Sequence, residues 1–393
     1  MLIAHVANFS LAQDDAPGPF DPPAKANVTD GGIKDDSEVA EDVFDDMKGA
    51  NAKVFSSVLL PIPEHSVRSL RAIKVTEKKL PKYPVYTKPR QVGDWKLTRL
   101  LVPVGDILPK LFWEDNSLCL IGQVGSLTKI SLNGDVKQRI ELDCDIADAG
   151  WSRLGLVLLD DNANELLLFD MASKQVKSIA PAPGDATLLC SRNSSLVFLT
   201  AGDAPWQAVY VFDLAGNRYL TSQDLMAEED GEGADVVAIS DDGRAIIGAN
   251  RSQLVVNRVQ GSGDLQLVAS RSLTETLEPL GLAVSKQGEV CLLFDQPRGS
   301  MPELSVQSWS APKLNSTGPA QQVNGSIHWL GHGPNDEWLA MDNAGGIWGP
   351  VNGKVGEIFY LPGIPSSTRT LAFSPQGAVA ALTDSAVFLG KKE

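Results

Sequence analysis

A unit of about 40 to 45 residues recurs along most of this chain and limits the folds open to it more than any other feature. Each unit places a short turn directly after an apolar stretch. The apolar residue before the turn falls at positions 113, 151, 190, 239, 284, 330 and 373, in steps of 38, 39, 49, 45, 46 and 43 residues. Such a period is typical of four-stranded propeller blades. Helical solenoids have similar periods, but short β-branched and aromatic runs broken by Gly, Asn and Asp favour strands.

Individual strands can be assigned within the units, because alternating apolar residues are bounded by turn residues such as those at 160–164. The expected strands of the second to fourth units are Gly155–Leu159, Glu165–Phe169, Gln175–Ile179, Leu196–Thr200, Ala208–Phe212, Arg218–Thr221, Ala245–Ala249, Gln253–Asn257 and Leu265–Ser270.

The last unit lacks a strand, and a strand without a partner precedes the first unit. After Phe373 the pattern leaves only Val379–Leu382 and Ala386–Leu389, whereas Trp95–Val102 reads as a strand outside any unit. If that strand supplies the outer strand of the last blade, the ring closes and no long edge stays exposed. The sequence therefore predicts an all-β, seven-bladed propeller of four-stranded blades, closed by a strand near 95–102.

Several turns and strand ends resemble those of WD-repeat proteins and related β-propellers. Ile239–Gly243 and Phe373–Gly377 are similar to that family's first tight turn, and Leu168–Met171 and Val211–Leu214 look like its Trp-Asp dipeptide with Phe replacing Trp. The resemblance is one of pattern and covers residues from about 96 to 393. The family's Gly-His dipeptide occurs only at Gly331-His332, in a predicted turn, so no buried His–Asp network is implied. The resemblance implies a rigid ring used mostly for protein–protein contacts, with a minority of enzymes.

Residues 1–92 are predicted to form a charged, Pro-containing and largely disordered tail before a propeller domain at 93–393. Within the acidic part, 14–46, eleven acidic residues accompany two basic ones, and such a segment cannot bury enough apolar surface to fold. The following part, 48–90, is basic. We expect it to lie on the protein's own acidic surface or to act as a linker; the alternative is a docking arm for an acidic partner.

Residues 1–12 resemble a shortened signal peptide without a basic beginning, so export to the periplasm or cell exterior and retention in the cytoplasm stay equally open. No run approaches the roughly 20 apolar residues of a membrane span. The formal net charge of −15 argues against a nucleic-acid partner, whose phosphates attract Lys and Arg.

Four cysteines stand far apart in mostly apolar surroundings, which favours buried reduced thiols over a zinc site; one disulfide is the alternative if the protein is exported. The cysteines are Cys119, Cys144, Cys190 and Cys291.

Two predicted loops carry the candidate binding residues. The loop 202–207 presents Trp206, and the longer loop 295–302 presents Arg298 and Met301; aromatic, Arg and Met side chains are common contact residues. Both loops occupy the same place in their units and are expected on one face. A weaker candidate is calcium at Glu229, Asp230 and Asp235, although the spacing of these acids matches no known calcium loop.

No metal site is otherwise expected, and no cofactor or catalytic motif is recognised. We therefore predict a protein-interaction or scaffolding module that binds a protein through its propeller-face loops. The alternative is an enzyme or small-ligand receptor that acts through the central channel.

Overall fold

A computed structural model describes residues 73–81, 86–102, 106–171, 173–201, 204–206, 208–226, 233–261, 263–273, 277–285, 288–298, 301–310, 313–323, 327–334, 337–351, 354–361, 364 and 367–392. All of them belong to one compact unit, Val58–Glu393. The predicted signal-like segment and the acidic part of the tail lie outside these residues. The described part of the chain consists of strands and turns, and none of it forms a helix that could cross a bilayer.

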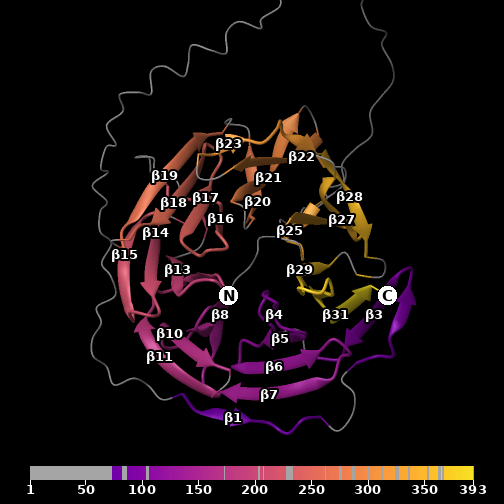
Figure 1. Ribbon diagram of the computed structural model, residues 1–393. Coiled ribbons are helices and arrows are strands. Elements are labelled where there is room, and N and C mark those ends of the chain that lie inside the picture. Colours follow the sequence, from indigo (N-terminus) through magenta and orange to yellow (C-terminus); the bar gives the residue numbers. More distant parts are fainter. Residues whose placement is uncertain are drawn as a thin grey trace, which may run out of the picture. The chain divides into compact units, whose positions relative to one another are not determined.

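Seven antiparallel sheets follow one another around a ring (Figure 1). Five of them consist of strands that are consecutive in the sequence, and blades 1 and 7 add strands from the N-terminal side. The inner strands of blades 1 to 7 are β4, β8, β12, β16, β20, β25 and β29, in that order. The predicted seven-bladed propeller is therefore confirmed, including the order of its blades.

The strands of blades 1 to 4 are β4 (Phe112–Glu114), β5 (Ser117–Ile121), β6 (Ser126–Ser131), β7 (Val136–Leu142), β8 (Ile146–Ser152), β9 (Gly155–Asp160), β10 (Glu165–Asp170), β11 (Gln175–Pro181), β12 (Thr187–Cys190), β13 (Leu196–Ala201), β14 (Ala208–Asp213), β15 (Arg218–Asp224), β16 (Val236–Ile239), β17 (Ala245–Ala249), β18 (Gln253–Val259) and β19 (Leu265–Ser272). Those of blades 5 to 7 are β20 (Glu278–Val284), β21 (Glu289–Arg298), β22 (Met301–Ser310), β23 (Asn315–Ser316), β24 (Gln321–Gln322), β25 (Ile327–His332), β26 (Trp338–Asp342), β27 (Gly346–Val351), β28 (Lys354–Tyr360), β29 (Thr368–Phe373), β30 (Val379–Thr383) and β31 (Val387–Lys392), with β2 (Arg90–Val92) and β3 (Trp95–Leu100) from the N-terminal side.

The ring closes as the sequence predicted. Strand β3 pairs antiparallel with the last strand, β31, from Trp95 opposite Lys392 to Leu100 opposite Val387. Blade 7 is thus assembled from both sides of the domain's sequence, so its edge is covered by a strand from the same chain.

Two short strands from the segment assigned to the tail add to the outside of blades. Strand β1 (Val75–Glu77) pairs with β7 of blade 1, and β2 pairs with β3 of blade 7. Both blades therefore have five strands. At these positions the basic segment lies along the propeller's own sheets.

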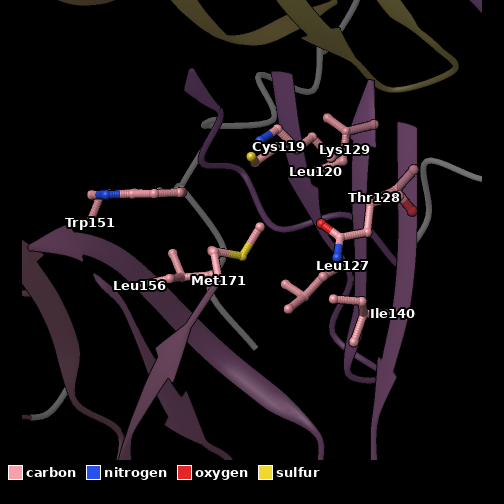
Figure 2. Close-up of a pocket in the computed structure, with 10 residues that line it drawn as sticks. Cys119, Leu120, Leu127, Thr128, Lys129, Ile140, Trp151, Leu156 and Met171 are labelled. Atoms are coloured by element: carbon pink, nitrogen blue, oxygen red, sulfur yellow. The ribbon is translucent and has the colours of Figure 1, made fainter. Parts of the chain in front are cut away.

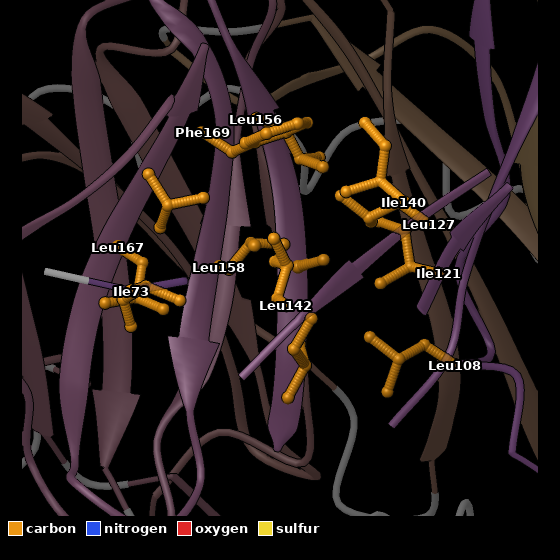
Figure 3. Close-up of a cluster of buried hydrophobic side chains, with 13 residues drawn as sticks. Ile73, Leu108, Ile121, Leu127, Ile140, Leu142, Leu156, Leu158, Leu167 and Phe169 are labelled. Atoms are coloured by element: carbon orange, nitrogen blue, oxygen red, sulfur yellow. The ribbon is translucent and has the colours of Figure 1, made fainter. Parts of the chain in front are cut away.

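The core is divided into seven apolar clusters, and each fills the space between two neighbouring blades. Figure 3 shows the cluster between blades 1 and 2, where Ile121 and Ile140 face Leu158 and Phe169. Full burial of one such side chain contributes about 1.5–3 kcal/mol. Because every blade has two apolar faces, a single blade could not be stable alone, and the repeat specifies a ring.

Candidate functional site

The antiparallel order of the strands divides the loops between two faces of the ring. Within each blade the strands are counted from the inner strand outwards. The face called the AB face carries the turns between first and second strands and those between third and fourth strands. The opposite face, called the BC face, carries the connections between second and third strands and the links to the next blade. The candidate residues that the structure describes lie on the BC face: Trp206 in blade 3, Arg298 and Met301 in blade 5, and Asp235 just before blade 4.

Trp206 is half-buried rather than fully exposed. Its side chain packs against the apolar cluster between blades 3 and 4, and its backbone forms an isolated bridge with Ala234. The two N–H···O hydrogen bonds of this bridge are 2.9 and 2.8 Å long. A Cβ atom on Gly233 would lie 2.6 Å from the Pro205 oxygen, so glycine is what lets the two segments approach. The sequence did not predict this contact between the Trp206 loop and the acidic connection.

Of the calcium candidates, Glu229 and Asp230 lie outside the described residues. Asp235 is half-buried, and its N–H donates a 2.8 Å hydrogen bond to the Ala249 oxygen. The described residues contain no group of three or more His, Cys, Asp or Glu side chains arranged to hold a metal ion. Calcium binding by the full acidic connection remains an untested prediction.

The predicted loop 295–302 is instead a β-ribbon. Strands β21 and β22 stay paired to the tip, where Arg298 lies opposite Met301 and Pro297 opposite Pro302. The neighbouring strand β20 reaches only to Asp295, so three residue pairs extend past it. At about 3.4 Å per residue, the ribbon projects roughly 10 Å beyond that strand. Prolines can sit in such a ribbon because each strand has an unpaired edge.

The charged residues of the seven inner strands are all engaged in ion pairs. Glu114 pairs with Lys129 at 2.7 Å, Asp148 with Lys110 at 2.7 Å, Glu278 with Arg251 at 3.8 Å and Arg369 with Asp384 at 2.5 Å. The ring of His332, at the end of β25, accepts a hydrogen bond at Nε2 from the Val284 N–H, 3.3 Å away. These groups connect blades or strands of the propeller.

All four cysteines are free thiols, as predicted; Cys119 and Cys291 are buried and the other two are half-buried. Burial, reinforced by the nearby Glu114 carboxylate, raises the pKa of the Cys119 thiol to about 12. Burial also raises the pKa of Cys190 to about 12. Both thiols stay protonated at neutral pH and are therefore poor nucleophiles.

On the AB face, hydrogen bonds link the turns of blades 2, 3 and 4. The Arg153 N–H donates to the Ser194 oxygen at 2.9 Å, and the Asn193 amide donates to the Asp241 carboxylate at 2.7 Å. The Ser194 hydroxyl also donates to the Gly243 oxygen at 3.3 Å. Three turns that are far apart in the sequence thus form one connected surface.

Three hollows on the propeller differ greatly in size. The hollow between blades 1 and 2, beside Cys119, Trp151 and Met171 (Figure 2), has a volume of about 10 Å³, which suits one water molecule at most. A second, of about 430 Å³, lies on blade 1 next to the exposed Leu101 and Val124.

The third hollow, of about 330 Å³, lies on the AB face between blades 3 and 4 and is lined by Arg153, Arg218 and Arg244. Sequence reasoning missed this arginine pocket. A signal for it exists, because Arg153 lies in the repeat-defining turn of its unit and Arg244 directly follows that of its own.

Comparison with solved structures gives a consistent result for the fold. The chain is similar to one in a structure of the mitotic checkpoint complex, with 13% identity, a TM-score of 0.54 and coverage of 81% of this chain and 96% of that one. It is also similar to the WD40 β-propeller domain of Doa1, with 10% identity, a TM-score of 0.52 and coverage of 74% and 95%. The fold is a seven-bladed β-propeller, similar to that of a WD40 domain.

A streptogramin B lyase structure is similar too, with 15% identity, a TM-score of 0.53 and coverage of 76% of this chain and 98% of that one. At such identities the likeness concerns the fold, which a WD40 domain and a lyase share. No family model matches the sequence, and no curated protein matches it.

Proposed function

We propose that this protein is a protein-binding platform whose partner docks on the BC face, across the ribbon β21–β22 and the Trp206 loop. The observation that carries the proposal is the ribbon, which extends three residue pairs past its neighbouring inner strand. A two-stranded projection offers a partner its free backbone edges, to which an extended segment can add as a further strand.

The Trp206 loop supports the same face. Its backbone is held by the bridge to Ala234, and Trp206 packs against the apolar cluster between blades 3 and 4 while the residue stays partly exposed. A large aromatic side chain held in this way resembles the anchors that dominate protein interfaces. Arg298 and Met301, at the tip of the ribbon, would supply the remaining contacts.

The second candidate function, an enzyme acting at the central channel, is favoured by the fold's likeness to a lyase. Against it, each acidic or basic residue of the inner strands forms an ion pair with a residue elsewhere in the propeller. Catalytic groups would have to leave these pairs or come from the loops. We therefore favour the binding platform.

The test is crosslinking with mass spectrometry on tagged full-length protein in its native host. We compare the wild type with Trp206→Ala and with Arg298→Glu, and use Leu154→Ala, an exposed residue on the AB face, as a control. The proposal expects a partner crosslinked near 204–206 or 296–303 that is lost in both BC-face variants and kept in the control. Equal recovery in all variants would contradict it.

A second chain, beginning at Ile73, tests the tail while keeping β1 and β2. A partner that binds the full chain but not this shorter one would place the binding element in residues 1–72 of the charged tail. A partner that binds both, and is lost with Arg298→Glu, would support the propeller face.

A further inference from the structure

The hollow on the AB face between blades 3 and 4, the arginine pocket, is lined by three arginines. Arg153 comes from the turn of blade 2, Arg218 from the start of β15 and Arg244 from the turn of blade 4, and all three line the same 330 Å³ hollow. Among the described residues none of the three makes an ion pair, whereas the neighbouring Arg258 is bound to Asp242. We propose that this pocket binds a small dianion, either a phosphate ester or a dicarboxylate.

The charge of the pocket favours an anionic ligand. Asp213 and Asp242 also line it, so the three lining arginines exceed the two lining carboxylates by one positive charge. Beside the pocket, Arg258 pairs with Asp242, and the Asp241 carboxylate accepts a hydrogen bond from the lining Asn193. Although burial opposes it, hydrogen bonds from Ser240, the Arg244 N–H and Arg258 lower the pKa of Asp242, which keeps this carboxylate ionised and paired. The chain as a whole has a net charge of −15, so this local excess of positive charge contrasts with it and would attract anions from solution.

The chemistry of arginine narrows the ligand further. A guanidinium group offers paired N–H donors that match the two oxygens of a carboxylate or phosphate, and such charge-assisted hydrogen bonds are about twice as strong as neutral ones. The volume is near the lower end of small-molecule sites, which begin at roughly 300 Å³. The ligand is therefore a small molecule or the terminal group of a larger one.

The pocket has a rigid base. The linked turns of blades 2, 3 and 4 carry Arg153 and Arg244, because the Arg153 N–H is bound to Ser194 and Ser194 is bound to Gly243. A Cβ atom on Gly243 would lie 2.4 Å from the Ser194 Cβ, so these turns are packed as closely as glycine allows. Donors held on a fixed base need less ordering when an anion arrives.

The rim provides a way to block the pocket without disturbing its base. Gly261 lines the hollow, and a Cβ atom added there meets no heavy atom within 4 Å. Gly261→Asp would therefore place a carboxylate at the mouth and repel an anion, while the fold is expected to tolerate it.

The experiment is isothermal titration of the full chain at pH 7.5 with inorganic phosphate and, separately, with succinate, against sodium chloride at equal ionic strength. The variants are Arg218→Ala, Arg244→Ala and Gly261→Asp. The control is Arg251→Ala, which removes an exposed arginine from the BC face. Thermal unfolding of each variant shows whether it remains folded.

We expect at least one dianion to bind the wild type and the control alike, and each arginine variant to weaken binding about tenfold. Gly261→Asp should weaken binding similarly at an unchanged melting temperature, so the proposal stays testable even if an arginine variant is unstable. Binding of phosphate alone would assign a phosphate ester, binding of succinate alone a dicarboxylate, and binding of both a site that accepts either dianion. Heats no larger than those with chloride, or binding unchanged in all three pocket variants, would overturn the proposal.

Discussion

Lys110 and Asp148 form an ion pair that joins three successive blades near their inner strands. Lys110 precedes β4 of blade 1, and its ammonium lies 2.7 Å from Oδ1 of Asp148 on β8 of blade 2. The same ammonium donates to the Leu188 oxygen on β12 of blade 3, and the Leu188 N–H donates back to Asp148 Oδ2, both at 2.7 Å. Asp148 is only 3% exposed, so its charge depends on these donors.

We expect Lys110→Met to destabilise the protein by about 2–3 kcal/mol, because it leaves a buried carboxylate without its cation. Asp148→Asn should destabilise the wild type but stabilise the Lys110→Met variant by about 1 kcal/mol, since the uncompensated charge is then removed. Urea denaturation gives the free energy of unfolding of the wild type, the two single variants and the double variant, which together form a double-mutant cycle.

The matched control for that cycle is the pair between Arg369 and Asp384, whose side chains are 53% and 57% exposed. Arg369→Ala should cost at most about 0.5 kcal/mol. If Lys110→Met were as mild as this control, the pair between the blades would be of no importance for stability.

Closure of the ring by β3 can be tested at Lys96, an exposed residue that lies between Gln91 of β2 and Lys391 of β31. Since a strand flanks it on each side, proline at this position removes a ladder hydrogen bond whichever way the N–H points. We expect Lys96→Pro to cost about 3 kcal/mol or more, and Lys96→Ala to cost little.

Thr76→Pro, in the outermost strand β1, is the comparison at a true edge and should cost clearly less than Lys96→Pro. The measurement is the melting temperature of Lys96→Pro, Lys96→Ala and Thr76→Pro. Equal losses at Lys96 and Thr76 would mean that closure contributes no more than an added edge strand.

The sequence allowed the regular parts of the ring to be predicted, because each blade follows local rules. The strand Ala245–Ala249 was predicted with both of its ends correct. The closing strand was predicted because the last unit lacked one strand. The remaining features depend on contacts between distant segments. The three residues of β1 form a strand only because β7 offers an edge, and nothing in their own pattern shows it.

The candidate sites were harder to predict for the same reason. Pro297 and Pro302 favoured a loop, yet they lie opposite each other in a ribbon that has free edges. The arginine pocket combines turns from three blades, so it becomes visible only when the repeats are placed side by side. The local sequence pattern is therefore enough to predict the propeller, whereas the candidate sites depend on contacts between neighbouring blades.

The pH dependence of stability should carry the signature of Cys119. Burial, with a contribution from Glu114, raises the pKa of this thiol from 9.0 to about 12 in the folded protein. The folded state therefore holds a proton that the unfolded state loses between these values. The contribution of Cys119 to the free energy of unfolding is complete below pH 9. It declines as the pH rises towards 12, by at most about 1.4 kcal/mol per pH unit.

Comparison with Cys119→Ala isolates this effect, because other groups titrate equally in both proteins. The stability difference between wild type and variant, measured by urea denaturation, should be constant from pH 7 to 8.5 and shrink above pH 9. A difference that stays constant up to pH 11 would show that the thiol has an ordinary pKa.

The bridge between Trp206 and Ala234 should depend on the glycine beside it. A Cβ atom at Gly233 would lie 2.6 Å from both the Pro205 oxygen and the Trp206 carbonyl carbon, and these backbone atoms cannot move aside cheaply. We expect Gly233→Ala to cost about 1–3 kcal/mol and to break the bridge. Hydrogen exchange should then show loss of protection at the Trp206 and Ala234 amides, both of which donate in this bridge.

Gly184→Ala is the control, since a Cβ atom there meets nothing within 4 Å. It should leave exchange at both amides and the melting temperature unchanged. If Gly233→Ala left these amides protected, the bridge would not need the close approach that glycine permits. If protection were lost while partner binding on the BC face persisted, the Trp206 loop would be excluded as an anchor and the ribbon would have to carry the interaction alone.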